Sequence, residues 1–156
     1  TSLVVSAADL ANVWVGGAIA SGSETLYVRA YDGFDWGNWD TFNLTTRANT
    51  LRVVAVADHS LARGTWAQLS NWLSYSDADG HAATKYEFWD DRTATGSAAF
   101  WTAAGGIQGG KTSLIVSDLS GVYVGGGTVP GTDQLYVRAY DGFGWSQWDQ
   151  FNLVTL

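Results

Sequence analysis

The stretch LYVRAYDGFGWSQWDQFNL, Leu135–Leu153, decides the fold of this chain, and it occurs there twice. The other copy is LYVRAYDGFDWGNWDTFNL, Leu26–Leu44. In each copy a stretch that alternates apolar and polar residues runs into Asp-Gly, and a second stretch follows. Asp-Gly is typical of a tight turn between antiparallel strands, because Gly adopts a positive φ at no steric cost. The sequence therefore predicts two hairpins of one design.

The repeat extends beyond the hairpins. Residues 1–46 align with residues 112–155 over 44 pairs, with one gap of two residues, and 28 of these pairs are identical. The offset of 109 to 111 residues predicts a unit the size of a β-sandwich domain, well above the roughly 20–50 residues of a solenoid repeat. We therefore expect residues 1–46 to be the C-terminal half of one repeat and residues 47–156 to be a complete repeat. This order is expected of a window cut from a tandem array.

Composition excludes several classes of protein. Of the 156 residues 46% are apolar and only 15% are charged, with 19 Gly, nine Trp and no Cys. Without Cys there are no disulfides and no thiolate chemistry. The net charge of −7 argues against nucleic acid and anionic membranes, since both are bound through Lys and Arg. No apolar run approaches the roughly 18 residues of a membrane span, so we expect no membrane insertion.

Alternation with a period of two and many β-branched residues predict an all-β fold. The expected strands are 51–57, 65–69, 85–89, 98–102, 113–124, 135–140 and 148–154. Seven short strands separated by Gly, Asp and Ser turns are typical of an antiparallel β-sandwich. The segment Asn71–Tyr75 is expected to form a short helical turn.

The hairpin has two different faces. Leu135, Val137 and Ala139 share one face of their strand, and Arg138 points to the other. We expect each guanidinium to lie on an indole ring, a contact worth about 0.5–2 kcal/mol. The expected partners are Trp145 or Trp148 for Arg138, and Trp36 or Trp39 for Arg29.

These residues also carry a family resemblance. GTDQLYVRAYDG resembles the penultimate strand of fibronectin type III and other immunoglobulin-like domains, and WSQW, Trp145–Trp148, resembles a Trp–Arg ladder found in some of them. Together with YSDADGHAATKYEFWDD, the unit resembles the cadherin-like and immunoglobulin-like repeats of large secreted RTX-type bacterial adhesins. The calcium-binding nonapeptide GGxGxDxUx of the β-roll is absent.

The resemblance implies an immunoglobulin-like β-sandwich on the bacterial cell surface or outside the cell. It also implies a structural or adhesive role, as a spacer or stiffening unit whose partners are the neighbouring repeats of the same chain. Self-association or binding of a surface glycan are further expectations.

The sequence SDADG suggests a calcium site. Two carboxylates two residues apart, followed by Gly, can converge on one hard cation, and a second segment usually completes its six to eight oxygen ligands. The expected ligands are Asp77, Asp79, Asp90 and Asp91. The EF-hand pattern fails, because His81 stands at its fifth position and Phe88 at its twelfth. The alternative is a turn in which the Asp side chain binds its own backbone.

The Trp residues outside the duplicated segment suggest a carbohydrate-binding surface, because sugar rings stack on exposed aromatic faces. They are Trp66, Trp72, Trp89 and Trp101. The alternative is packing in the core and between strands, where most aromatic area in a sandwich lies.

Nucleotide binding and catalysis have little support. Gly105–Thr112, GGIQGGKT, matches the P-loop pattern, but a β-rich stretch follows where a helix is required, so we expect no nucleotide. His59 and His81 are the only His residues, and neighbours such as Asp90 and Asp91 on a strand point to opposite faces. We therefore expect that the chain is not an enzyme.

Overall fold

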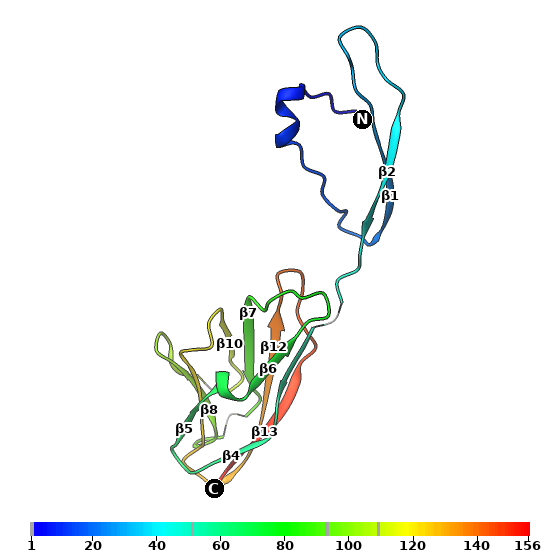
Figure 1. Ribbon diagram of the computed structural model, residues 1–156. Coiled ribbons are helices and arrows are strands. Elements are labelled where there is room, and N and C mark those ends of the chain that lie inside the picture. Colours follow the sequence, from blue (N-terminus) through cyan, green and yellow to red (C-terminus); the bar gives the residue numbers. More distant parts are fainter. Residues whose placement is uncertain (1, 51, 93, 109) are drawn as a thin grey trace. The chain divides into compact units, whose positions relative to one another are not determined.

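A computed structural model describes residues 2–50, 52–92, 94–108 and 110–156. The expectations that involve Thr1, Leu51 and Gly109 lie outside these residues. The structure divides the chain into two compact units, one ending at Ala48 and one running from Asn49 to Leu156 (Figure 1). We call them the N-terminal unit and the complete unit. The sequence predicts the boundary after residue 46, two residues earlier.

The complete unit is an all-β sandwich, as the sequence predicts. One sheet contains, in order, β10 (Ser113–Val116), β7 (Lys85–Asp90), β12 (Gly131–Tyr140), β13 (Asp149–Thr155) and β4 (His59–Leu61). The other contains β5 (Trp66–Gln68), β11 (Val122–Gly125), β8 (Ala99–Thr102) and β9 (Gly106–Gln108). The strands β3 (Val53–Val56) and β6 (Leu73–Ser76) form a separate ribbon, and η2 (Leu69–Asn71) is a 3₁₀ turn. The pair of β13 with β4 is parallel, and the other pairs among the described residues are antiparallel.

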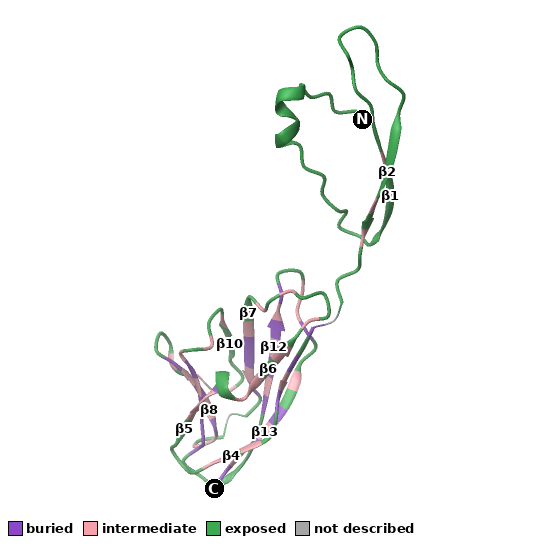
Figure 2. Ribbon diagram, viewed as in Figure 1, coloured by how far each residue is buried: buried purple, intermediate pink, exposed green. Residues whose placement is uncertain are grey.

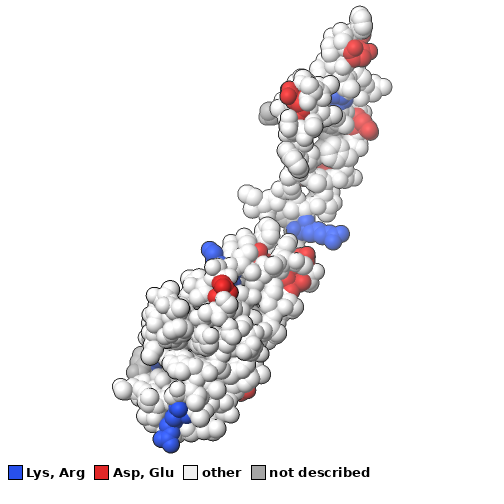
Figure 3. Space-filling view, turned by 60° about the vertical axis from the view of Figure 1, so that its left-hand side comes forward, with Lys and Arg blue, Asp and Glu red and all other residues white. Residues whose placement is uncertain are grey.

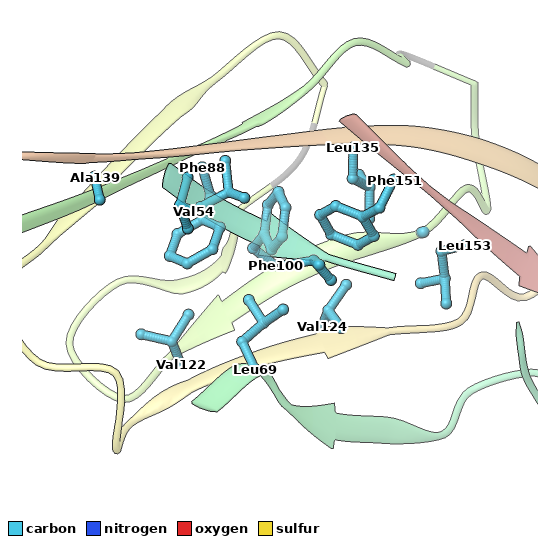
Figure 4. Packing of buried hydrophobic residues seen from close by; sticks show 13 residues of the cluster. Val54, Leu69, Phe88, Phe100, Val122, Val124, Leu135, Ala139, Phe151 and Leu153 are labelled. Atoms are coloured by element: carbon cyan, nitrogen blue, oxygen red, sulfur yellow. The ribbon is translucent and has the colours of Figure 1, made fainter. Parts of the chain in front are cut away.

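The core lies between the two sheets. Phe88 on β7 and Phe100 on β8 meet across it, with ring centroids 5.3 Å apart (Figure 4). As the alternation predicts, Leu135, Val137 and Ala139 on β12 are completely buried. In Figure 1, β5 and β8 lie on one side of the unit, and β12 and β13 lie on the other. The apolar faces of both sheets are therefore removed from water, which is the main stabilising term of such a fold.

Three short strands, β4, β6 and β9, were not predicted. The single strand expected over residues 113–124 is two strands in two different sheets. They are separated where Asp118 accepts hydrogen bonds from the backbone N–H (2.8 Å) and the hydroxyl (2.6 Å) of Ser120. The helical turn expected over Asn71–Tyr75 is wrong in place, since η2 ends at Asn71 and β6 begins at Leu73. Gln68 ends β5, and Leu69 directly after it begins the turn.

The N-terminal unit contains a 3₁₀ helix, η1 (Ala7–Asn12), and a hairpin of β1 (Gly22–Val28) and β2 (Asp40–Thr46). Ser6 caps η1 by accepting the N–H of Asp9. No residue from 2 to 48 is buried (Figure 2).

Across all the described residues, neither of the two short helices has the length and apolar character needed to span a bilayer.

The turn of the hairpin has the same geometry in both units. Asp32 accepts the backbone N–H groups of Phe34 and Asp35, each at 2.8 Å. Asp141 accepts those of Phe143 and Gly144 at 2.8 and 2.9 Å. Gly33 and Gly142 follow these Asp residues with φ of 103° and 101°, a region that favours Gly. Local sequence therefore fixes this turn whatever packs around it.

Candidate cation site and aromatic surfaces

The loop from Asp77 to His81, between β6 and β7, forms a turn around its first carboxylate. The Oδ1 of Asp77 accepts the backbone N–H of Asp79 (2.8 Å) and of His81 (3.2 Å). Gly80 takes a φ of 79°. The Oδ2 of Asp79 accepts the backbone N–H (2.6 Å) and hydroxyl (2.7 Å) of Thr50. The Asx-type turn expected as the alternative is thus present, and the loop is anchored to the start of the complete unit.

The same loop brings together three potential cation ligands. Asp77, Asp79 and His81 each offer one potential ligand atom, and these three atoms lie within 4.8 Å of one another. The side chain of Asp77 is only 1% exposed, and its buried Oδ2 has no hydrogen-bond partner among the described residues. A buried carboxylate oxygen without a partner is costly, and a bound cation satisfies it. Burial, and then the nearby carboxylates of Asp77 and Asp141, raise the pKa of Tyr75.

Asp90 and Asp91 do not join these ligands. The loop enters β7 at Lys85, whereas Asp90 ends that strand, so the two groups lie at opposite ends of β7. Asp90 is completely buried and accepts the N–H groups of Arg92 (2.9 Å) and Gly110 (3.1 Å). Burial raises its pKa. The expectation that all four Asp residues converge is therefore wrong for Asp90 and Asp91. His81 takes their place in the cluster, and it was not predicted because its imidazole is not an oxygen ligand of the kind calcium prefers.

An aromatic surface crosses the outer face of the four-stranded sheet. Ile107 on β9 lies opposite Trp101 on β8, and Trp101 lies opposite Tyr123 on β11. Together with Trp66 on β5 they line a hollow of about 470 Å³. Each strand of the sheet contributes one side chain, and none of the residues in these four strands is charged. Figure 3 shows how few charged side chains interrupt the surface of the unit in that view.

Trp66 lies flat on this sheet. A Cβ added to Gly125, its cross-strand neighbour, would lie 2.7–2.8 Å from three atoms of the six-membered ring of Trp66. Three nearly equal distances place the ring face-on over the Gly. Trp66 remains 43% exposed, so the other ring face is open to solvent. Gly125 is needed at this position because any side chain would displace the indole.

The other two Trp residues of the expected sugar-binding set lie elsewhere. Trp72 packs against the core and stacks on His59, with ring centroids 3.8 Å apart and planes 13° apart. Trp89 lies on β7 in the five-stranded sheet. The structure therefore brings together only Trp66 and Trp101, and it adds Tyr123 and Ile107. Alternation within β8 and β11 is the signal that would have identified Tyr123.

The Arg–Trp contacts have the expected partners in both units. The guanidinium carbon of Arg138 lies 4.6 Å from the ring centroid of Trp145 and 4.5 Å from that of Trp148. Arg29 lies 4.6 Å from Trp36 and 4.4 Å from Trp39 in the N-terminal unit. Each Arg is therefore held between two rings rather than on one.

Arg138 makes a further contact that Arg29 lacks among the described residues. Its Nε and Nη2 each lie 2.6 Å from Oε2 of Glu87 on β7. Glu87 is 7% exposed, and its other oxygen accepts the hydroxyl of Ser113 on β10. Arg138 therefore connects β12 to β7 as well as to the turn of its own hairpin.

Replacing Arg138 with Ala is expected to destabilise the complete unit by about 2 kcal/mol, since it removes the stacking and leaves a nearly buried carboxylate without its charged partner. Arg138→Lys keeps the charge but loses the planar stack, so it is expected to recover only part of this loss. Chemical denaturation followed by Trp fluorescence measures both. Arg29→Ala is the matched control, and an equal loss of stability from that substitution would contradict the assignment.

Comparison with known proteins gives a distant structural likeness. No protein-family model matches the chain, and no curated protein matches it. Among solved structures it is similar to domains 4 and 5 of the S-layer protein SbsC, with 19% identity and a TM-score of 0.44 over 85% of this chain and 58% of that one. It is also similar to a longer chain of the same S-layer protein, with 14% identity and a TM-score of 0.48 over 88% of this chain and 17% of that one. The chain thus spans a little over half of the first neighbour and a small part of the second.

Proposed function

We propose that this chain is part of a tandem array of immunoglobulin-like β-sandwich modules in a large secreted bacterial surface protein. In this role each module acts as a spacer that sets the length of the array. The duplicated hairpin and the offset of about 110 residues support the tandem organisation. The sequence resemblance to adhesin repeats supports the surface location, and the absence of a catalytic role remains a prediction.

One observation carries the spacer role: the polypeptide enters and leaves the complete unit at opposite ends of its longest strand. Asn49 donates a hydrogen bond to Asp141, directly after the last residue of β12. Thr155, directly before the last residue of the chain, pairs with Gly131, the first residue of β12. Ten residues of β-strand span about 30 Å. Each further module is therefore expected to add about this length.

Small-angle scattering from arrays of one, two and three copies of residues 47–156 tests the spacer role. The maximum dimension is expected to grow by at least about 30 Å for each added copy. An array whose maximum dimension stayed near that of a single copy would contradict the proposal.

We also propose that Asp77, Asp79 and His81 bind a divalent cation. Two carboxylates suit calcium, but calcium takes six to eight oxygens and the three residues supply fewer. The imidazole nitrogen of His81 is a better ligand for zinc or another transition metal. The unpartnered Oδ2 of Asp77 supports a cation of either kind.

Addition of the cation at 100 times its Kd is expected to stabilise the complete unit by about 2.7 kcal/mol, because it binds only the folded loop. Thermal unfolding in calcium, in zinc and in chelator measures the effect and identifies the metal. Asp77→Asn is expected to abolish it. Asp91→Asn, which removes a half-exposed carboxylate elsewhere, is expected to leave it intact. Superimposable melting curves in both metals and in chelator would exclude the site.

A second candidate function is binding of a neutral glycan on the aromatic surface formed by Trp66, Trp101, Ile107 and Tyr123. The open face of Trp66 and the complete lack of charge in the four strands favour it over a charged ligand. Gln68, the cross-strand partner of Tyr123 on this face, offers its amide oxygen to sugar hydroxyls.

Screening of neutral polysaccharides by affinity electrophoresis tests this candidate. If a polysaccharide retards the protein, Trp66→Ala is expected to weaken its affinity about fivefold or more, because each aromatic platform contributes on the order of 1 kcal/mol or more. Trp89→Ala, on the other sheet, is the matched control. Equal retardation of both variants would show that the surface is not the binding site.

A further inference from the structure

The two copies of the hairpin form an internal comparison, because nearly identical sequence stands in two environments. The pairing register is the same, since Leu26 pairs with Phe42 and Leu135 with Phe151. Phe151 is completely buried, whereas Phe42 is 44% exposed. Val137 is likewise completely buried, whereas its equivalent Val28 is 52% exposed. The hairpin thus forms in both units, but only one copy has its apolar face covered.

The comparison extends to the residues before the hairpin. In the complete unit, Ser113–Val116 and Val122–Gly125 are the strands β10 and β11. Their equivalents in the N-terminal unit, residues 2–5 and 13–16, form no strand. Trp14, which corresponds to the half-buried Tyr123, is 89% exposed. The residues before the hairpin are therefore strands in the complete unit, whereas their equivalents in the N-terminal unit are not.

The pairing in the complete unit identifies the strands that the N-terminal unit lacks. There β10 pairs with β7, and β11 pairs with β5 and β8. All three partner strands come from residues 49–111, which have no counterpart in the N-terminal unit. β1 and β2 persist without this segment because they pair with each other. The structural difference between the two units is therefore the presence or absence of one segment.

We propose that the exposed apolar face of the N-terminal unit binds a segment of the 49–111 type, joined ahead of it in the same polypeptide. The order follows the complete unit, where this segment precedes its hairpin. This inference rests on the proposed tandem organisation and names the partner it requires. On binding, residues 2–5 and 13–16 become strands, and the face that contains Val28 and Phe42 becomes part of a second core.

One substitution between the copies fits such a partner. Asp35 stands where the complete unit has Gly144, beside the guanidinium of Arg52. A Cβ at Gly144 would lie 2.7 Å from Nη2 of Arg52, the mobile end of a long side chain. An Arg52 equivalent would therefore move slightly and meet a carboxylate of opposite charge. The N-terminal unit keeps the other partner of that Arg as well, since Asp32 corresponds to Asp141.

The test adds a second copy of residues 47–111 in front of the full chain, so that it leads directly into residue 1. Hydrogen–deuterium exchange with mass spectrometry then follows the amides of β1 and β2. The differing residues Asp35 and Gly144 allow peptides from the two hairpins to be distinguished. The extension is expected to slow exchange in β1 and β2 at least about 100-fold, because these amides then open only when a cooperative unit unfolds. Unchanged exchange would overturn the proposal.

Two substitutions distinguish packing against the apolar face from ordering that comes only from the longer chain. Val28→Asp is expected to abolish the protection in the extended chain, while it leaves exchange in the original chain unchanged. Thr25→Asp, whose equivalent Gln134 is exposed in the complete unit, is expected to preserve the protection. Protection that survived Val28→Asp would overturn the proposed core.

Hydrogen–deuterium exchange measured over a range of protein concentrations tests whether a second copy of the chain covers the apolar face instead. If the original chain alone gained protection in β1 and β2 as its concentration rose, the face would bind a second copy, and the proposal would be wrong. The spacer role is tested separately by the dimensions of arrays of residues 47–156. Arrays that lengthen while β1 and β2 stay unprotected would refute this inference alone.

Discussion

Replacing Phe151 with Ala is expected to destabilise the complete unit by about 3–5 kcal/mol, and the same substitution at Phe42 is expected to leave that unit unchanged. Phe151 is completely buried in the core between the two sheets, so its loss removes apolar contact and leaves a cavity. Phe42 occupies the same position of the same hairpin but is 44% exposed. Such a loss at Phe151 lowers the melting temperature by at least about 10 °C for a domain of this size.

Calorimetry measures this pair of variants directly. The wild-type chain is expected to show one cooperative transition, from the complete unit, because no described residue of the N-terminal unit is buried. Leu153→Ala and Leu44→Ala form a second matched pair, with the first Leu completely buried and the second partly exposed. Equal losses at equivalent positions would show that the N-terminal unit contributes to the same cooperative core.

Replacing Asp141 with Ala is expected to cost about 3–5 kcal/mol, because it leaves a buried Arg without its partner. Nη1 of Arg52 lies 2.9 Å from Oδ2 of Asp141, and both residues are buried. Asn49 donates to the same oxygen, and Oδ1 accepts the backbone N–H groups of the turn. Asp141→Asn keeps an acceptor for the turn, so the difference between the two variants isolates the loss of charge.

Asp32→Ala is the matched control, since it removes the same turn from the N-terminal unit, where no described Arg approaches it. It is expected to leave the stability of the complete unit unchanged. A large loss from Asp32→Ala, or a negligible loss from Asp141→Ala, would contradict the role of the buried pair. Denaturation in urea, followed by Trp fluorescence, is the measurement.

The depressed pKa of Asp141 predicts that the complete unit loses stability in acid. Burial alone would raise the pKa of Asp141, but the hydrogen bonds from Asn49, Gly144 and Phe143 and the charge of Arg52 outweigh it and hold the pKa well below its usual range. A depressed pKa in the folded state stabilises the protein above the unfolded value, near 3.9, and this stabilisation is lost as the pH falls below that value. The free energy of unfolding is therefore expected to decline below about pH 4, and the decline is expected to be smaller in Asp141→Asn.

The sequence predicts those parts of the fold that local pattern determines. Alternation placed Leu135, Val137 and Ala139 on one face, and Asp-Gly placed the turn, because both signals act within a few residues. The strands β4, β6 and β9 were missed for the opposite reason. His59–Leu61 and Gly106–Gln108 contain three residues each, and long-range pairing with β13 and β8 alone makes them strands.

The candidate sites were predicted where their residues are neighbours in sequence. Asp77 and Asp79 converge because the turn that holds them is local. Asp90 was misplaced, because it ends the strand that the loop enters at Lys85 and therefore lies at the far end of β7. Trp66 and Trp101 share a surface through the order of β5, β11 and β8, which no local signal encodes. The structure was needed wherever topology, rather than spacing, brings residues together.

The parallel pair of β4 and β13 has a mechanical consequence. The chain leaves β4 toward residue 49 and leaves β13 toward Leu156, so tension applied through these two ends pulls the paired strands in opposite directions along their length. The three ladder positions from Leu153–His59 to Thr155–Leu61 are then loaded together in shear, rather than broken one after another. Asp58, which accepts the backbone N–H (2.7 Å) and the side-chain amide (3.0 Å) of Asn152, is loaded in the same direction. Pulling through residues 49 and 156 in an optical trap is therefore expected to require a higher rupture force than pulling β12 and β13 apart from their turn.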